Sequence, residues 1–219
     1  METASDPVDT DVSSPTERSN SEDTRDNIID VATEEFARYG LAGARIDTIA
    51  AKTLTSKRMI YYHFRDKEHL YLSCLEHAYR VARAKEQQLA IEGLDPLVAI
   101  ERIAECTFDH HWNSVNFVRL VMIENIHNAE YLERSDVIAE LNRTAIDQIS
   151  RVYEDGVASG VFRAGLDPLY IHWQLSAQCF YNVSNQATFS RVFGRDMTDA
   201  GVQRQLRRHV VENMLRFLQ

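Results

Sequence analysis

The sequence predicts an all-α protein of about nine helices. Across most of the chain, apolar residues recur at every third or fourth position, which is the spacing of one helix face. The chain contains only four Pro and eight Gly, fewer than a many-stranded β architecture with frequent turns would need. It also lacks an alternating apolar–polar run of useful length and any internal repeat.

The N-terminal region divides into a tail and a helix. Residues 1–20 are expected to be a disordered acidic tail, because they are rich in Ser, Thr, Asp and Pro and carry almost no large apolar side chains. Helical spacing begins at about Asp23, with Ile28 and Phe36 on one face. Gly40 is suited to the left-handed conformation that follows a helix, so we expect the first helix to end there.

Two short helices and a turn come next. The second predicted helix covers residues 46–53, and the third covers residues 56–63 with Ser56 or Thr55 as its N-cap. Asp66 is expected to cap a long fourth helix. We therefore predict a three-helix N-terminal domain over residues 21–72 and a larger helical domain over residues 73–219.

The later helices begin at recognisable signals. Asp95 and Asp167 each precede a proline, which places a capping carboxylate before a proline at the first helical position. Ser114 is expected to cap a helix through residue 126, and Asp136 one through residue 160. The last segment, 200–217, keeps an apolar stripe at every fourth position.

The net charge of −9 is unevenly distributed. Residues 1–22 contain six acids and one base, whereas residues 45–67 contain six bases and two acids. The basic region coincides with the two short helices and the turn, which indicates a polyanionic partner there. A solvated charged surface is the simpler alternative.

Residues 45–67 have the properties of a helix-turn-helix that reads DNA. Small residues at Ala50 and Ala51 let two helices cross closely, and the start of the following helix carries Lys57 and Arg58, where it would point into a groove. An arginine there can bond bidentately to guanine, and tyrosine rings suit phosphate and thymine-methyl contacts. The residues expected to contact DNA are Arg45, Thr48, Thr55, Ser56, Lys57, Arg58, Tyr61, Tyr62, His63 and Lys67.

Residues 26–75 resemble the DNA-binding domain of the TetR-type transcriptional regulators. The family framework of fixed spacings is present as Ile49-Ala50, Ser56, Tyr62-His63-Phe64, Lys67-Glu68 and Leu70. Two positions depart from the pattern: Leu54 stands where the family usually has a turn glycine, and Arg45 stands where it usually has Thr. A left-handed Leu54 would cost about 1–2 kcal/mol.

The resemblance implies a homodimeric, ligand-responsive regulator, expected to be a repressor that binds double-stranded DNA at a palindromic operator. It also implies an effector-binding C-terminal domain that dimerises through the last two helices, about residues 168–190 and 200–217. Three widely spaced cysteines without a pairing motif, no secretory signal and no apolar run of bilayer length predict a cytoplasmic location without a membrane contact.

Large apolar and polar residues intermingle in the C-terminal half, as they do in buried ligand sites. Each of these residues taken singly is better explained by core packing, and only the set suggests a pocket. The candidate effector residues are Trp112, Phe117, Met122, Asn125, Trp173, Gln174 and Phe180.

Other chemistries find little support in the sequence. Glu105, Cys106 and the run Asp109-His110-His111 could ligate a metal, but adjacent histidines on a helix diverge by about 100°. Glu124 with His127 gives only half of a di-iron motif. We predict no metal, no cofactor and no catalysis. Two alternatives are a helical small-molecule-binding protein or enzyme with a vestigial helix-turn-helix, and an adaptor that recruits partners through its acidic tail.

Overall fold

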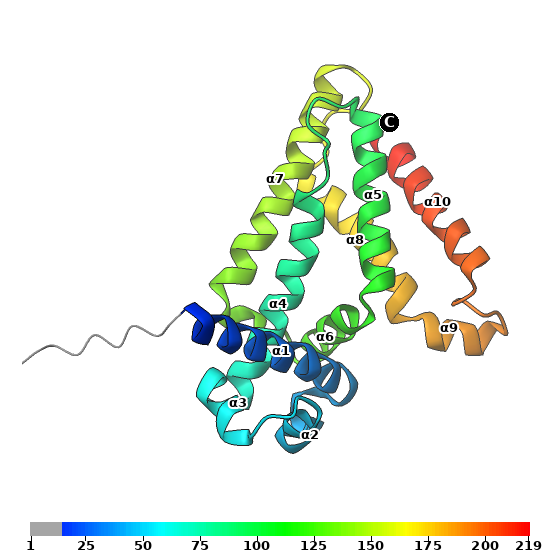
Figure 1. The fold of residues 1–219 in the computed structure, drawn as a ribbon. Coiled ribbons are helices and arrows are strands. Elements are labelled where there is room, and N and C mark those ends of the chain that lie inside the picture. The colour runs from blue at the N-terminus through cyan, green and yellow to red at the C-terminus, as the bar shows by residue number, and fades with distance from the viewer. Residues whose placement is uncertain (1–14) are drawn as a thin grey trace, which may run out of the picture.

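The computed structural model describes residues 15–219, with side chains described from residue 21, and this part of the chain contains helices joined by loops and no strands. Ten α-helices and a 3₁₀ turn at Leu132–Arg134 make up the fold (Figure 1). The helices are α1 (Pro15–Gly43), α2 (Ile46–Lys52), α3 (Lys57–Phe64), α4 (Lys67–Gln87), α5 (Pro96–Asn113), α6 (Val115–Ile126), α7 (Asp136–Ala158), α8 (Pro168–Ser184), α9 (Gln186–Phe193) and α10 (Ala200–Leu218). The all-α prediction is confirmed.

Most predicted helix starts are confirmed by their capping bonds. The Asp66 carboxylate accepts a hydrogen bond from the backbone N–H of His69, and Asp95 and Asp167 each cap a helix with proline in its first turn. Gly40 interrupts α1 with a φ of 68°, as expected of the residue that ends the first helix.

Four details of the predicted boundaries are wrong. Residues 15–20 are helical rather than part of a disordered tail, consistent with a proline in the first turn of α1, while residues 1–14 lie outside the described residues. Ser135, not Asp136, caps α7 through its hydroxyl. Ser114 precedes α6 without a side-chain capping bond. The segment 168–190 is two helices, because α8 ends at Ser184.

The molecule has a small head and a larger body that share α4. The head consists of α1, α2 and α3 and the body of α5 to α10, and Figure 1 shows α4 running from the head into the body alongside α7. The core of the head includes Phe36, Ile49 and Ile60, and it continues into the body through Leu120 of α6 and Ile138 of α7. The boundary predicted near residue 72 therefore falls inside the continuous helix α4.

The body has its own apolar core between α5, α7, α8 and α10, which includes Phe108, Tyr153, Leu175 and Met214. A smaller cluster around Phe117 joins α6 to α8. None of the helices in the described part of the chain is long and apolar enough to cross a membrane.

Candidate DNA-binding and ligand-binding sites

Buried apolar contacts hold α3 against α2. Ile49 of α2 and Ile60 of α3 are completely buried, and Phe64 closes the same core. At the end of α2, the Thr53 hydroxyl donates to the carbonyl of Ile49 at 2.9 Å, which satisfies a terminal carbonyl of the helix. The pair of helices is therefore a rigid support for whatever α3 presents outward.

The turn between α2 and α3 has the strained conformation anticipated from its sequence. Leu54 has a φ of 53°, in the left-handed region that disfavours side chains, and it is 95% exposed. The next backbone N–H, of Thr55, returns to the carbonyl of Ala50 at 3.1 Å. The turn thus forms with Leu54 in the place of a glycine, without any burial of the leucine side chain.

The backbone N–H groups at the starts of α2 and α3 find hydrogen-bond acceptors in different ways. The Ser56 hydroxyl accepts from the N–H of Met59 at 3.1 Å, as the sequence predicted. Arg45 precedes α2 without a side-chain capping bond. The buried carboxylate of Glu35 compensates, since it accepts from the Arg45 N–H at 3.5 Å and pairs with Lys52 at 3.6 Å. Sequence analysis missed Glu35, because an acid on an apolar helix face carries no signal of its distant partner.

The outward surface of the two helices collects the residues predicted to contact DNA. Arg45, Ser56, Lys57, Arg58, Tyr61 and Tyr62 are exposed, whereas Thr48, Thr55, His63 and Lys67 are half-buried. Tyr62 is the most accessible of the aromatic residues there, at 78% exposure. This surface therefore presents guanidinium, ammonium and phenol groups to solvent, with no change in the fold.

Two of these residues have protein partners in this structure. The Lys57 ammonium pairs with Asp47 of α2 at 2.5 Å, and the Lys67 ammonium donates to the carbonyl of Ala42 at 3.4 Å. Burial, with a smaller contribution from Arg25, lowers the pKa of His63, which favours a neutral ring near pH 7. His63 can therefore accept or donate a hydrogen bond without adding a charge.

A cavity of about 340 Å³, open to solvent on one side, lies in the body and is lined by α4, α5, α6, α7 and α8. Its walls include aromatic rings, three histidines and one ion pair. Tyr79 and Phe117 meet edge to face with ring centroids 5.3 Å apart, and Phe117 also contacts His110 and His111. Such a mixture of apolar walls and few polar groups is characteristic of small-molecule sites.

The cavity gathers four of the seven candidate effector residues, namely Phe117, Asn125, Trp173 and Phe180. The other three do not line it: Trp112 and Met122 pack against the apolar clusters, and Gln174 is exposed. These three residues lie on helices that line the cavity, but their side chains are on other faces of those helices.

The charged groups of the cavity were missed. Arg83 and Glu86 of α4 form an ion pair on its wall, with side chains 9% and 14% exposed. A signal was available in the sequence, because Glu86 extends the apolar stripe of α4 that runs through Ala78 and Ala82. A charged residue at such a position must find a buried partner.

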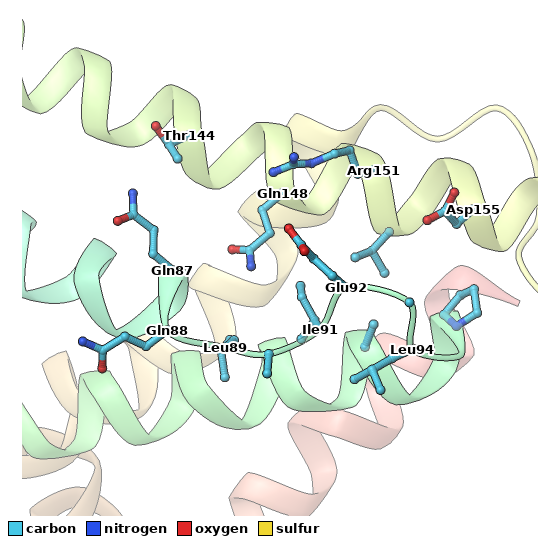
Figure 2. Close-up of a pocket in the computed structure, with 15 residues that line it drawn as sticks. Gln87, Gln88, Leu89, Ile91, Glu92, Leu94, Thr144, Gln148, Arg151 and Asp155 are labelled. Carbon is cyan, nitrogen blue, oxygen red and sulfur yellow. The ribbon is translucent and has the colours of Figure 1, made fainter.

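A larger hollow of about 690 Å³ lies between the segment 88–95 and α7. Figure 2 shows Gln148, Arg151 and Asp155 of α7 facing Glu92 and the backbone of that segment. It has no lining residue from α6 or α8 and none of the aromatic wall residues described above. The aromatic cavity is therefore the better candidate for a ligand site.

Comparisons with known proteins agree with this arrangement. Residues 28–74 match the family described as bacterial regulatory proteins, tetR family, and residues 96–214 match the tetracyclin repressor-like C-terminal domain. The chain belongs to the TetR family. It is a ligand-responsive, DNA-binding transcriptional regulator, of a family whose members regulate transcription rather than catalyse reactions.

Curated TetR relatives include two repressors. The chain is 30% identical to the HTH-type transcriptional repressor NicS of Pseudomonas putida over 176 residues, which cover 80% of this chain and 83% of that protein. It is 47% identical over 106 residues to the repressor SCO4008 of Streptomyces coelicolor, covering 48% of this chain and 51% of that protein.

Solved structures share the TetR fold. The regulator SCO4942 of Streptomyces coelicolor superposes with a TM-score of 0.67 at 25% identity, over 89% of this chain and 98% of that one. FadR of Bacillus subtilis in complex with stearoyl-CoA gives a TM-score of 0.68 at 17% identity, over 88% and 98% of the two chains. At this identity the likeness to FadR concerns the fold alone.

A buried polar junction connects the head of this TetR protein to its body. Tyr71 of α4 donates its hydroxyl to Glu124 of α6 at 2.8 Å, and both side chains are buried. The other Glu124 oxygen accepts from the backbone N–H groups of Tyr131 and Leu132, each at 3.1 Å. Glu124 is thus a structural acceptor that fixes the segment after α6 against α4.

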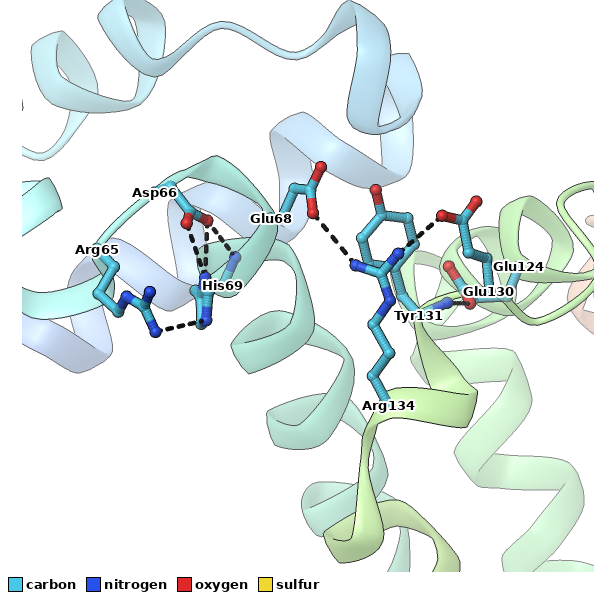
Figure 3. Close-up of polar contacts among 8 residues, drawn as sticks. All are labelled: Arg65, Asp66, Glu68, His69, Glu124, Glu130, Tyr131 and Arg134. Carbon is cyan, nitrogen blue, oxygen red and sulfur yellow. Dashed lines mark hydrogen bonds and ion pairs between the residues drawn. The ribbon is translucent and has the colours of Figure 1, made fainter.

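An exposed layer surrounds this junction. Figure 3 shows Arg134 lying over the Tyr131 ring, 4.4 Å from its centroid, between two carboxylates. Its guanidinium pairs with Glu68 at 3.2 Å and with Glu130 at 2.8 Å. Glu68 follows Lys67 directly, so the DNA-side end of α4 is tied to the body by an ion pair.

Two of the residues considered as metal ligands, Glu105 and Asp109, are paired with an arginine. Arg207 of α10 pairs with Asp109 at 2.8 Å and also with Glu105, and so clamps α10 onto α5. Within residues 21–219, no group of three side chains is arranged to hold a metal ion. Cys74 is fully buried, and burial raises the pKa of its thiol to about 12, which argues against a redox role.

Proposed function

We propose that this TetR protein represses transcription by binding a palindromic operator as a homodimer, and that a small molecule in the aromatic cavity releases it. The observation that carries the proposal is the course of α4. This helix begins at Lys67, beside the DNA-contacting surface, and its later turns supply Tyr79, Arg83 and Glu86 to the cavity wall. A ligand that changes the position of α4 would therefore change the position of the head.

DNA contact is assigned to the exposed surface of α3 and its flanks. Arg58 and Tyr62 are proposed to read bases, while Tyr61, Arg45 and Lys67 are proposed to bind phosphates. The exposure of Arg58 and Tyr62 supports these assignments. The remaining proposed contacts come from Thr48, Thr55, Ser56, Lys57 and His63.

The dimer interface is assigned to α8 and α10. Four large side chains on α8 are more than half exposed although apolar: Leu169, Tyr170, Trp173 and Tyr181. An apolar surface of this kind on a helix favours burial against a second copy. Two-fold symmetry would then place the two heads about one helical turn of DNA apart, ~34–36 Å, or a multiple of it.

We propose that the ligand releases the DNA by shifting an equilibrium between two states of the dimer, which differ in the distance between its two heads. A ligand shifts such an equilibrium only as far as its affinities for the two states differ. The cavity wall contains α6 residues Phe117, Val121 and Asn125, and the same helix carries Glu124, which holds Tyr71 of α4. A displacement of α6 on ligand binding would thus be transmitted to α4 through a buried hydrogen bond.

The size of the cavity favours a small ligand. A volume of about 340 Å³ is near the lower end of the range for small-molecule pockets. Polar residues of the wall come from all five helices that line it, so a compact molecule could contact several helices at once.

The DNA proposal is tested by selecting bound duplexes from a random pool and comparing variants on the selected sequence. Arg58→Ala should weaken binding to the selected duplex more than to random DNA, by about 1–3 kcal/mol. Lys67→Ala should weaken both alike and lower the salt slope by about one. Equal losses for Arg58→Ala on both DNAs would remove Arg58 from base readout. Absence of any binding at low salt would favour the alternative of a vestigial helix-turn-helix.

The dimer proposal is tested by light scattering during gel filtration. We expect a dimeric mass at micromolar concentration, and a monomeric mass for Tyr170→Glu with Trp173→Glu. A matched control is Val192→Glu, a similarly exposed apolar residue on α9 that is outside the proposed interface. A monomeric wild-type protein would contradict both the interface and the palindromic operator.

A further inference from the structure

Two buried polar atoms of the cavity wall have no hydrogen-bond partner. They are Nε of Arg83 and Nε2 of His110, whose residues are only 8% and 5% exposed. Within the described side chains, only Thr33 provides another such atom. Leaving a buried polar atom unpaired is unfavourable, so the occurrence of two such atoms in one cavity indicates a site for a polar ligand.

Arg83 restricts the chemistry of that partner. A guanidinium has five N–H donors and no acceptor, so its free Nε–H requires an acceptor. The adjacent NH1 group is paired with Glu86, one helical turn further along α4. A ligand that brings an acceptor oxygen or nitrogen would satisfy this donor.

The three histidines of the wall line the same cavity as Arg83 and add no charge to it. His111 donates its Nδ1–H to the carbonyl of Thr107 at 2.8 Å, His110 meets the Ser114 hydroxyl at 3.4 Å, and His172 meets the Ser176 hydroxyl at 3.3 Å. Burial is the largest cause that lowers the pKa of all three, to about 3 for His110 and about 4 for His172. All three rings are neutral at pH 7.

The charge of the cavity therefore depends on one ion pair. The other titratable groups that line the cavity are Tyr79 and Glu86 on α4, His110 and His111 on α5, and His172 on α8, while α6 and α7 contribute the neutral Asn125 and Asn142. Lys85 of α4 is not part of the lining, and its charge also lowers the pKa of His110. Burial raises the pKa of Glu86, and the charge of Arg83 opposes this shift. The cavity is close to neutral, so an anionic ligand would add an uncompensated charge unless Glu86 took up a proton.

The apolar wall favours a flat ring. Phe117 contacts Tyr79, His110 and His111 at centroid distances of 5.1–5.8 Å, and His111 contacts Phe180 at 6.4 Å. Rings in edge-to-face contact line a surface against which another ring can stack or insert.

We propose that the cavity binds a small aromatic carboxylate, with the carboxylate bonded to Arg83 and His110 and the ring against Phe117 and Phe180. This assignment rests on the proposed function, because it names the effector class for the same cavity. The ligand carboxylate bonds to the free Nε–H of Arg83 beside Glu86. One guanidinium cannot neutralise two buried carboxylates, so Glu86 takes one proton from solvent. The buried cluster of Arg83, Glu86 and ligand then carries the same net charge as before, so no additional charge is buried.

The test titrates the full-length protein with benzoate and cinnamate and with their neutral amides, benzamide and cinnamamide. We expect each acid to bind at least about tenfold more tightly than its amide, the factor that corresponds to one charge-assisted hydrogen bond. Calorimetry in two buffers of different ionisation enthalpy should show uptake of about one proton per bound acid, and so weaker binding as the pH rises. Amides that bind as well as the acids, acids that do not bind, or binding without proton uptake would each overturn the proposal.

Variants locate the site. Arg83→Gln combined with Glu86→Gln removes both charges without leaving one unpaired, and it should abolish the preference for the acid over the amide. Arg151→Gln is the matched control, because Arg151 lines the other hollow and is exposed. If the double variant denatures at a lower temperature than wild type, His110→Phe provides the second test, since it should also lower affinity for the acids. A preference kept in both variants would refute the assignment.

Release from the selected DNA, followed by fluorescence anisotropy, separates this inference from the proposed function. An acid that binds with proton uptake but leaves the DNA complex intact would refute the effector role and keep the site. A neutral molecule that releases the DNA, where the acids neither bind nor release it, would refute the ligand class and keep the regulatory function.

Discussion

Replacing Leu54 by glycine should stabilise this protein, although the change removes a large apolar side chain. Leu54 has a φ of 53° in the turn between α2 and α3. Its side chain is 95% exposed, so almost no buried apolar area is lost on substitution. The usual penalty for deleting a leucine therefore does not apply here.

The magnitude follows from two opposing terms. The left-handed conformation costs a residue with a Cβ about 1–2 kcal/mol, and glycine avoids this cost. Glycine in turn gives the unfolded chain more freedom, which lowers stability by about 0.4–1 kcal/mol. The midpoints of the two terms leave a net gain of about 0.8 kcal/mol, or a rise of about 2–3 °C in Tm for a chain of this length.

The assay is urea unfolding at one fixed protein concentration, which keeps any association constant between variants. Leu54→Ala is the control, because alanine removes the side chain but keeps the Cβ and its strain, and it should leave the unfolding free energy nearly unchanged. A Leu54→Gly protein less stable than wild type, or an equal gain for Leu54→Ala, would refute the reasoning.

Three further predictions concern buried positions. Tyr71→Phe removes the hydroxyl that donates to Glu124 and should lower the unfolding free energy by about 1–3 kcal/mol, whereas the exposed Tyr39→Phe should leave it unchanged. Gly156→Ala would place a Cβ 1.9 Å from the Phe162 ring, and we expect thermal unfolding to show a loss of about 1–3 kcal/mol from overpacking. Cys74, buried with a raised thiol pKa, should not react with a thiol reagent until urea unfolds the chain; a stoichiometric reaction in the native state would contradict its burial.

Local signals explain why so many helix starts were predictable. A capping residue such as Asp66 or Asp95 acts on the first turn of its own helix, so the interaction is written within a few residues. Where two such residues were adjacent, the sequence could not choose between them: Ser135 caps α7, although Asp136 was predicted. The choice depends on which side chain reaches the free N–H groups.

The candidate ligand site was only partly predictable for a related reason. Helical spacing identifies a face as apolar but does not say which neighbouring helix that face meets. Phe117 and Phe180 proved to line the cavity, whereas Trp112 packs into the core beside it. Glu124 was interpreted only as half of a metal motif, because its hydrogen-bond donor Tyr71 lies 53 residues earlier in the chain.

The sequence by itself determined the all-helical fold, the helix-turn-helix and its strained turn, since each depends on periodicity, caps and backbone preference among near neighbours. The tertiary structure alone decided how the ion pair of Arg83 and Glu86, the three histidines and the rings of α6 and α8 come together. These groups lie on helices far apart in the chain, and only packing of α4, α5, α6 and α8 sets the distances between them. Their unpaired donors are a property of that packing, which is why the ligand class could be inferred only from the folded protein.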